Sequence, residues 1–228
     1  MMPSIIYEDN HLLAINKPAG WLVQGDRTGD RTLTDWGKTY LKEKYAKPGA
    51  VFLHPAHRID RPVSGAVLFA RTDKALGRLT SVFRNREVDK TYLALVLWAP
   101  EHTVGELRHF LLKDESRNVV QVFAMPVAGA KEAILHYAYL GKAGALHLME
   151  IHPLTGRPHQ IRAQLAAMGL PIAGDLKYGA SVPLPDASIG LHSRRLVLEH
   201  PVRKTPLALT APLPEQPIWR EAALLVAG

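Results

Sequence analysis

The densest group of residues able to do chemistry is the segment 57–65, with the sequence HRIDRPVSG. Asp60 stands between Arg58 and Arg61, and nearby cations favour the ionised form of a carboxyl group. The proline and glycine in this segment indicate a constrained backbone ahead of an apolar run, where a loop can hold a reactive side chain rigidly. Two interpretations are possible, a structural ion pair that closes the loop and a catalytic carboxylate. Spacing alone favours the structural ion pair.

A second group lies in the segment 154–162, with the sequence LTGRPHQIR. It combines backbone N–H groups, the start of an expected helix and the two arginines Arg157 and Arg162, an arrangement that suits anions. Helical spacing places His159 and Arg162 on one face, away from the apolar stripe that begins at Ile161, so Arg162 is expected to point into a cleft. The competing interpretation is an ordinary capped helix with solvated charges.

Tyr92 is the third candidate, near the start of an apolar segment. A tyrosine there is usually a core residue with a satisfied hydroxyl. It can also serve as a stacking platform for a nucleic-acid base.

The other patterns exclude several site classes. His54 and His57 have no obvious third ligand partner, so no metal is expected. The absence of cysteine rules out disulfides, a thiolate nucleophile and cysteine-ligated clusters. The glycine-rich phosphate and dinucleotide loops, the nucleophile elbow and the zinc-protease motif are missing as well.

Composition points to a folded protein with a polyanionic partner. The 228 residues are 47% hydrophobic, and 28 basic against 21 acidic residues give a formal net charge of +7. No segment has the roughly 20 apolar residues that span a bilayer, and the first residues do not resemble a signal peptide, so a cytoplasmic protein is expected. No linker interrupts the chain, which predicts a single domain over residues 1–228.

The elements that must position these residues can be read from periodicity. Helices are expected over 33–41 behind Thr32 or Thr34, over 72–86, and from Pro158 to a stop at Gly169. A turn at 141–144 is expected to join two strands. The expected strands are 5–7, 11–16, 63–70, 91–98, 133–139, 145–151, 196–198 and 207–210. Strands outnumber helices without regular alternation, which predicts an α+β fold with a mixed, mainly antiparallel sheet.

Five motifs in this order resemble the RluA family of RNA pseudouridine synthases. The resemblance covers residues 5–201, although Ile59 replaces the family's usual leucine and Val63 its frequent threonine. The motifs are NKPAG (16–20), HRIDRPVSG (57–65), KTY (90–92), TGRPHQIR (155–162) and GDLKYG (174–179).

This resemblance implies a reaction that cleaves the N1–C1′ bond of uridine, turns the uracil and rejoins it through C5. Asp60 matches the catalytic aspartate, acting as a base toward the ribose or as a nucleophile, and Arg162 matches the arginine that keeps this aspartate ionised. Tyr92 matches the tyrosine that packs on the target base. Arg58 would fill the gap left by the flipped uridine, and Ile161 would pack beneath the pocket.

The resemblance further implies supporting roles for Lys17, Arg61, Arg157, His159 and Asp175. It implies a mixed, mainly antiparallel bent sheet with flanking helices and a central catalytic cleft, and no cofactor. The RNA partner, rRNA or tRNA, would be held by the catalytic domain itself. The candidate phosphate contacts are the arginines of 72–86, the lysines of 38–47, and Arg194 with Arg195.

Two other functions stay open. A catalytically silent RNA-binding protein could use the same scaffold. A carboxylate-dependent hydrolase of nucleosides would need a second carboxylate beside Asp60, and the sequence offers no strong partner. A monomer is expected.

Overall fold

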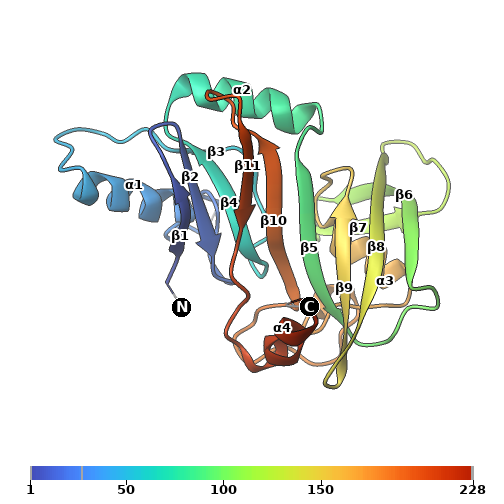
Figure 1. Cartoon of the computed structure of the whole chain (residues 1–228). Coiled ribbons are helices and arrows are strands. Elements are labelled where there is room, and N and C mark those ends of the chain that lie inside the picture. Colours follow the sequence, from blue (N-terminus) through green and yellow to red (C-terminus); the bar gives the residue numbers. More distant parts are fainter. Residues whose placement is uncertain (1, 27, 227–228) are drawn as a thin grey trace. The chain divides into compact units, whose positions relative to one another are not determined.

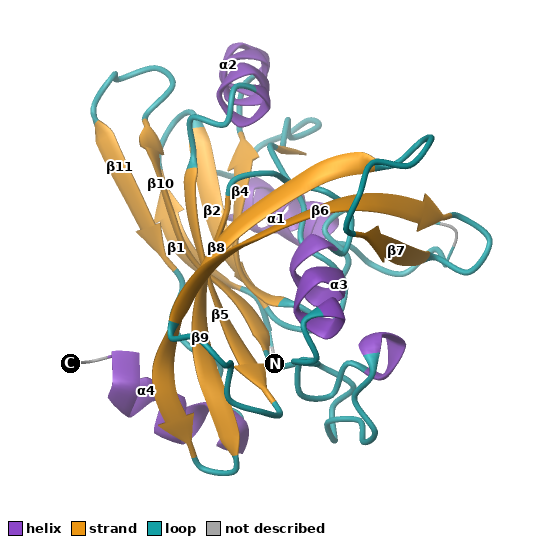
Figure 2. Ribbon diagram, turned by 90° about the vertical axis from the view of Figure 1, so that its right-hand side faces the viewer, coloured by secondary structure: helices purple, strands orange, loops and turns teal. Residues whose placement is uncertain are grey.

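The computed structural model describes residues 2–26 and 28–226, and the chain forms two compact units. The first unit comprises Met1–Asp89 and Ser193–Pro212, and the second comprises Lys90–His192 and Leu213–Gly228. Each unit has a β-sheet with helices packed against it (Figures 1 and 2). The expected single domain over 1–228 stays a prediction.

The sheet of the first unit has the order β1-β2-β4-β10-β11, and the short β3 pairs with β4. β1 with β2, β2 with β4, β3 with β4 and β10 with β11 are antiparallel. Its strands are β1 (Ser4–Glu8), β2 (Leu12–Lys17), β3 (His54–Pro55), β4 (Ser64–Ala70), most of β10 (Leu191–Glu199) and β11 (Pro206–Thr210).

Helices α1 (Leu33–Lys44) and α2 (Asp73–Arg84) cover opposite faces of this sheet. Successive residues of a strand face opposite sides. In β2, Leu13 and Ile15 point to the same face and approach α1 at Gly37. The alternate residues of β2 point to the other face and pack in the core beneath α2. This double cover explains why every residue of β4 is buried.

The second unit has the strand order β5-β9-β8-β6-β7, with β5–β9, β9–β8, β8–β6 and β6–β7 all antiparallel. Its strands are β5 (Asp89–Val96, except its first residue), β6 (Val104–Asp114), β7 (Val119–Phe123), β8 (Lys131–Ala143) and β9 (Leu146–Pro153).

The helices of the second unit also lie on both faces of its sheet. Helix α3 (Gln160–Ala167) packs beside β6 and β7 (Figure 2). On the opposite face, Trp219 of η2 (Pro217–Trp219) and Ala222 of α4 (Arg220–Val226) pack against β5 and β9. A further 3-10 turn, η1 (Leu176–Tyr178), follows α3.

The α+β class with mainly antiparallel pairing is confirmed, while three local expectations are wrong. β8 continues through a bulge near Gly141, so the turn to β9 lies at 144–145 instead of 141–144. β5 ends at Val96, and Trp98 is exposed in the following loop. Pro158 precedes α3, because His159 adopts a left-handed conformation just before the helix. No helix within the described ranges is long and apolar enough to span a bilayer.

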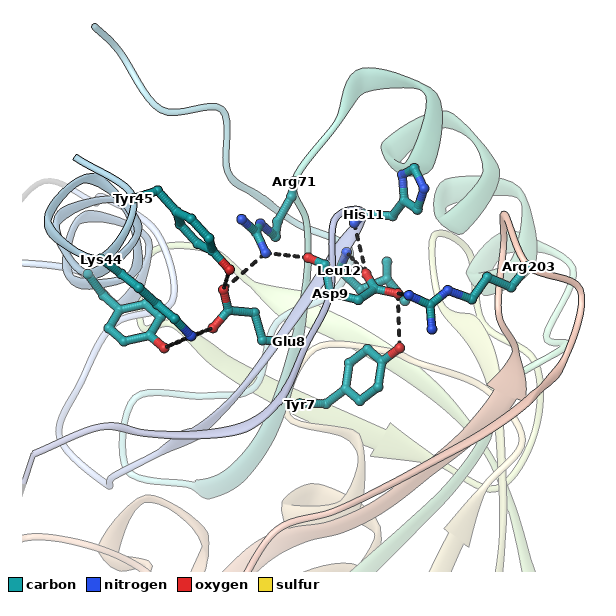
Figure 3. Close-up of polar contacts among 10 residues, drawn as sticks. Tyr7, Glu8, Asp9, His11, Leu12, Lys44, Tyr45, Arg71 and Arg203 are labelled. Carbon is teal, nitrogen blue, oxygen red and sulfur yellow. Dashed lines mark hydrogen bonds and ion pairs between the residues drawn. The ribbon is translucent and has the colours of Figure 1, made fainter. Parts of the chain in front are cut away.

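Two buried carboxylates organise the turn between β1 and β2 (Figure 3). Glu8, 9% exposed, accepts hydrogen bonds from Tyr40, Lys44, Tyr45 and Arg71. Burial opposes its ionisation, but the bonds from Lys44, Tyr45 and Tyr40 outweigh burial and lower the Glu8 pKa to about 2. The N-terminal hairpin is thereby tied to α1 and to the end of β4.

The neighbouring Asp9 binds groups from the other side of the turn. Burial opposes its ionisation, and bonds from the backbone N–H groups of His11 and Leu12 are the main factor that lowers its pKa to about 2. His200 Nδ1 accepts backbone N–H groups of residues 202 and 203, so its Nε2 carries the proton donated to Asp9. This bond joins the hairpin to the end of β10.

We expect Glu8→Gln to destabilise the protein at pH 7 and to weaken its acid sensitivity. A carboxylate with a folded pKa below its unfolded value stabilises the protein above the unfolded pKa, and this contribution disappears between about pH 5 and pH 2. For Glu8 the lowering of the pKa from 4.5 to about 2 corresponds to at most about 3 kcal/mol. Urea unfolding at pH 7 and pH 3 measures the difference. Glu199→Gln, which breaks an exposed pair with Lys204, is the control and should change little. An unchanged pH dependence in Glu8→Gln would contradict the role.

Candidate active site

Asp60 lies in the loop between β3 and β4, and the loop is anchored to β4 at its start. The backbone N–H of Ala56 donates to Leu68 O at 2.9 Å, and Leu68 N–H donates to His57 Nε2 at 3.1 Å. The His57 ring stacks on Phe83 of α2, with centroids 4.8 Å apart. Asp60 itself closes a turn, because its carbonyl accepts the N–H of residue 63.

The other side of the loop is held by the segment that follows β2. Gly20 N–H donates to Arg61 O at 2.8 Å, and Arg61 Nε donates back to Gly20 O at 3.0 Å. Lys17 Nζ donates to the carbonyls of Pro18, Trp21 and Arg61 at 3.1, 2.8 and 3.0 Å. The backbone next to Asp60 is therefore fixed by a side chain that is completely buried.

The environment of Lys17 sets two effects against each other. Burial lowers the pKa of Lys17 to about 7, while the charge of Asp60 raises it. Three carbonyl acceptors at hydrogen-bond distance match the three donors of an ammonium group. We conclude that Lys17 supports the Asp60 loop. Arg61 pairs with Asp30 at 2.7 Å on the surface, and Arg58 is exposed.

Gly65 allows β4 to pass close to β10. Its φ is +115°, and a Cβ there would lie 2.3 Å from Ser193 O, so both backbone conformation and space require glycine. We expect Gly65→Ala to destabilise the protein by about 2–3 kcal/mol.

Gly77→Ala is the matched control for Gly65→Ala. Gly77 lies in the interior of α2 with open space around its Cα, so alanine should stabilise the protein by about 0.5–1 kcal/mol. Thermal unfolding of both variants measures the two shifts. Equal shifts of the same sign would contradict the close-approach argument.

A buried polar network shapes the turn before α3. Thr155 Oγ1 accepts Ile134 N–H at 2.9 Å and donates to Gln160 Oε1 at 2.8 Å. Gln160 Oε1 also accepts the N–H of Arg157, and Arg157 Nε donates to Glu132 O at 2.9 Å. One backbone N–H expected to bind an anion is thus used within the protein.

Arg162 is buried in α3 and forms a two-point ion pair with Asp175. Its Nε donates to Asp175 Oδ2 at 2.7 Å and its Nη2 to Oδ1 at 2.8 Å. The side chains of Arg162 and Asp175 are 6% and 1% exposed. The Tyr178 ring lies against the guanidinium, 5.0 Å from centroid to Cζ. Asp175 and Tyr178 thus hold the arginine in one orientation.

Tyr92 and Ile161 belong to the same side of the second unit as Arg162. Tyr92 in β5 is opposite Ile151 in β9, and Ile151 is opposite Tyr137 in β8, so these three share the face against which α3 packs. Tyr92 is half-buried and Ile161 in α3 is 7% exposed.

The predicted site residues form two groups, each within one unit. Lys17, Arg58, Asp60 and Arg61 come together around one loop of the first unit. The second unit brings together the predicted residues of α3 and its leading turn, namely Arg157, His159, Ile161 and Arg162, on the sheet face that also holds Tyr92.

Sequence reasoning overlooked the roles of Gln160 and Tyr178. The three-residue spacing between Asp175 and Tyr178 could have indicated that they act together. Only their contacts with Arg162 in α3 show that both hold this side chain. Over residues 2–26 and 28–226, no group of three or more histidine and acidic side chains is placed to hold a metal ion.

Fold and motifs together define an RNA-modifying enzyme. The chain belongs to the RNA pseudouridylate synthase family, whose model matches residues 11–167. It is therefore an RNA pseudouridine-forming isomerase.

Particular relatives match most of the chain. The tRNA pseudouridine synthase C of Vibrio cholerae is 32% identical over 96% of this chain and 93% of its own length. The ribosomal large subunit pseudouridine synthase C of Vibrio vulnificus is 34% identical over 93% of this chain and 66% of its own length. The solved structure of human RNA pseudouridylate synthase domain containing 4 has a TM-score of 0.79 at 23% identity, covering 98% and 93% of the two chains, and supports the fold.

Proposed function

We propose that this protein isomerises uridines in structured tRNA or rRNA, with Asp60 as the acting carboxylate. The observation that carries the assignment of Asp60 is its loop, which is fixed by His57 on one side and by Lys17 on the other. A rigid loop is what a reactive group needs, because small displacements from reacting geometry are costly.

In this proposal Asp60 acts on the ribose of a uridine flipped out of its stack. Either it removes a ribose proton or it attacks the sugar, and in both cases the N1–C1′ bond breaks. The detached uracil turns, the C5–C1′ bond forms, and the C5 proton leaves. Arg162 would keep Asp60 ionised, and Tyr92 would pack on the base.

The remaining predicted residues bind RNA in this proposal. Arg58 is exposed and is suited to fill the gap left by the flipped base. Ile161 would pack beneath the base, and Arg157, His159 and Arg61 would contact the RNA around it.

Several of the basic side chains that were expected to contact phosphate form bonds within the protein. Lys44 pairs with Glu8, Arg78 donates to Pro201 O, and Arg194 donates to Ala211 O. Burial also lowers the pKa of Arg194. The expected RNA contacts are therefore the other basic residues, namely Lys38, Lys42, Lys47, Arg84, Arg86 and Arg195.

The relatives support an RNA substrate, since their names refer to tRNA and to the large ribosomal subunit. We further propose that the protein acts as a cytoplasmic monomer without a metal or cofactor. We also propose that residues 1–228 form a single catalytic domain with a central catalytic cleft.

Loss of the C5 proton gives a direct test. Transcripts of tRNA and of 23S-type rRNA, labelled with tritium at uridine C5, are incubated with the wild-type protein. We expect tritium release together with pseudouridine in the digested product, and the responding transcript names the RNA class. Transcripts labelled at cytidine C5 serve as the control and should release nothing.

Two outcomes would contradict the proposal. RNA binding without tritium release from any transcript would favour the silent binding protein. Free uracil released from uridine without RNA would favour the nucleoside hydrolase, because an isomerase returns the base to the same ribose.

A further inference from the structure

Tyr178 contacts β7, α3 and the residue just before α3. Its ring lies against the guanidinium of Arg162 in α3, at 5.0 Å. Its hydroxyl accepts Val120 N–H from β7 at 2.8 Å and shares a hydrogen bond of 2.8 Å with His159 Nδ1. One side chain in η1 therefore connects the edge strand β7 with the residue before α3 and with the first turn of α3.

The local backbone gives this contact a defined geometry. His159, just before α3, has φ +50°, a conformation that non-glycine residues rarely adopt and that needs support from surrounding contacts. The His159 side chain makes no capping hydrogen bond to the first turn of α3, and its ring hydrogen-bonds the hydroxyl of Tyr178 instead. The rings of His159 and Tyr178 also meet edge to face, with centroids 5.7 Å apart.

Asp175 and Tyr178 contact the guanidinium of Arg162 in different ways. A two-point ion pair fixes the guanidinium in the plane of the carboxylate. The aromatic face of Tyr178 lies against the guanidinium and restrains it out of that plane. Asp175 and Tyr178 restrain different motions of the same group.

We propose that Tyr178 is a positioning residue for the reaction, which orients Arg162 with its ring and holds the start of α3 on β7 with its hydroxyl. This inference rests on the proposed function, in which Arg162 acts on Asp60. The hydroxyl bond to β7 also makes the position of Arg162 depend on β7.

The test uses a signal that does not depend on activity. The ¹H–¹⁵N resonance of Arg162 Nε reports both its hydrogen bond to Asp175 and the ring current of Tyr178, and Arg162→Lys assigns it by its loss. We expect Tyr178→Leu to shift this resonance and to lower kcat about tenfold to a hundredfold, with little change in KM. Tyr178→Phe keeps the ring, so it should give a smaller shift and a loss of about threefold in kcat.

Tyr139→Phe is the matched control for Tyr178→Phe. Tyr139 shares a hydrogen bond of 2.9 Å with His147 Nδ1 in the same unit, so the variant removes a similar tyrosine–histidine bond elsewhere. It should change neither the Arg162 resonance nor kcat. Loss of kcat in this variant equal to that of Tyr178→Phe would overturn the inference.

The remaining outcomes are also decisive. A folded Tyr178→Leu protein with the wild-type Arg162 resonance would overturn the inference. If Tyr178→Leu does not fold, Tyr178→Phe decides, and an unchanged resonance with unchanged kcat overturns the proposal. If the wild-type protein forms no pseudouridine, the proposed function fails, while the resonance still tests the positioning of Arg162.

Discussion

Asp60→Asn is expected to reduce tritium release from C5-labelled RNA by about a thousandfold or more. The amide is nearly the same shape as the carboxylate, but it can neither take a ribose proton nor attack the sugar. The loop should keep its structure, because its anchors are the His57 ring, the Lys17 ammonium and backbone groups. RNA affinity, measured by filter binding at fixed salt, should stay within a few-fold of wild type.

Asp30→Asn is the control for the loss of an acidic charge in this region. Asp30 is about half exposed and pairs with Arg61, the residue next to Asp60, so the variant makes the same chemical change nearby. It should retain nearly full activity. Retention of activity by Asp60→Asn would contradict the assignment of the acting carboxylate, and equal losses in both variants would indicate an electrostatic effect instead.

We expect Asp175→Ala to lower the free energy of unfolding by about 3 kcal/mol and to abolish most activity. The variant removes the carboxylate that accepts two hydrogen bonds from the buried Arg162. Losing one partner of a buried pair is costly because the charge that stays behind is desolvated. Urea unfolding measures the stability, and tritium release below the unfolding transition measures the activity.

A double variant separates stability from catalysis. Arg162→Met combined with Asp175→Ala removes both charges, so it should regain part of the lost stability and stay inactive. Glu132→Ala is a surface control, since Glu132 pairs with the exposed Arg108. A double variant less stable than the sum of the two single changes would contradict the pairing argument.

Local sequence predicted the elements whose signal is short-range. The strand 63–70 was expected from an unbroken apolar run, and β4 occupies Ser64–Ala70 with every residue buried. The helix expected over 72–86 occupies Asp73–Arg84, and the Thr72 hydroxyl before it accepts Ala75 N–H. Apolar periodicity and capping act within a few residues, so they can be read without knowledge of the fold.

Elements that depend on distant partners were predicted less well. Glycines at 141 and 144 indicated a turn, yet β8 extends past Gly141 because β9 pairs with it through a bulge. Pro158 suggested a first helical turn, yet the network of Thr155, Gln160 and Ile134 shapes that segment and delays α3 to Gln160. Pairing partners and buried networks lie outside the local window.

The sequence by itself determined which residues we propose for the chemistry: the aspartate between two arginines, the tyrosine of β5 and the arginine of α3. Only the tertiary structure decided how they are held. Lys17 reaches a carbonyl 44 positions along the chain, and Tyr178 meets β7 58 positions away. Such contacts are set by packing and by the need to satisfy buried polar groups, which short-range patterns do not encode.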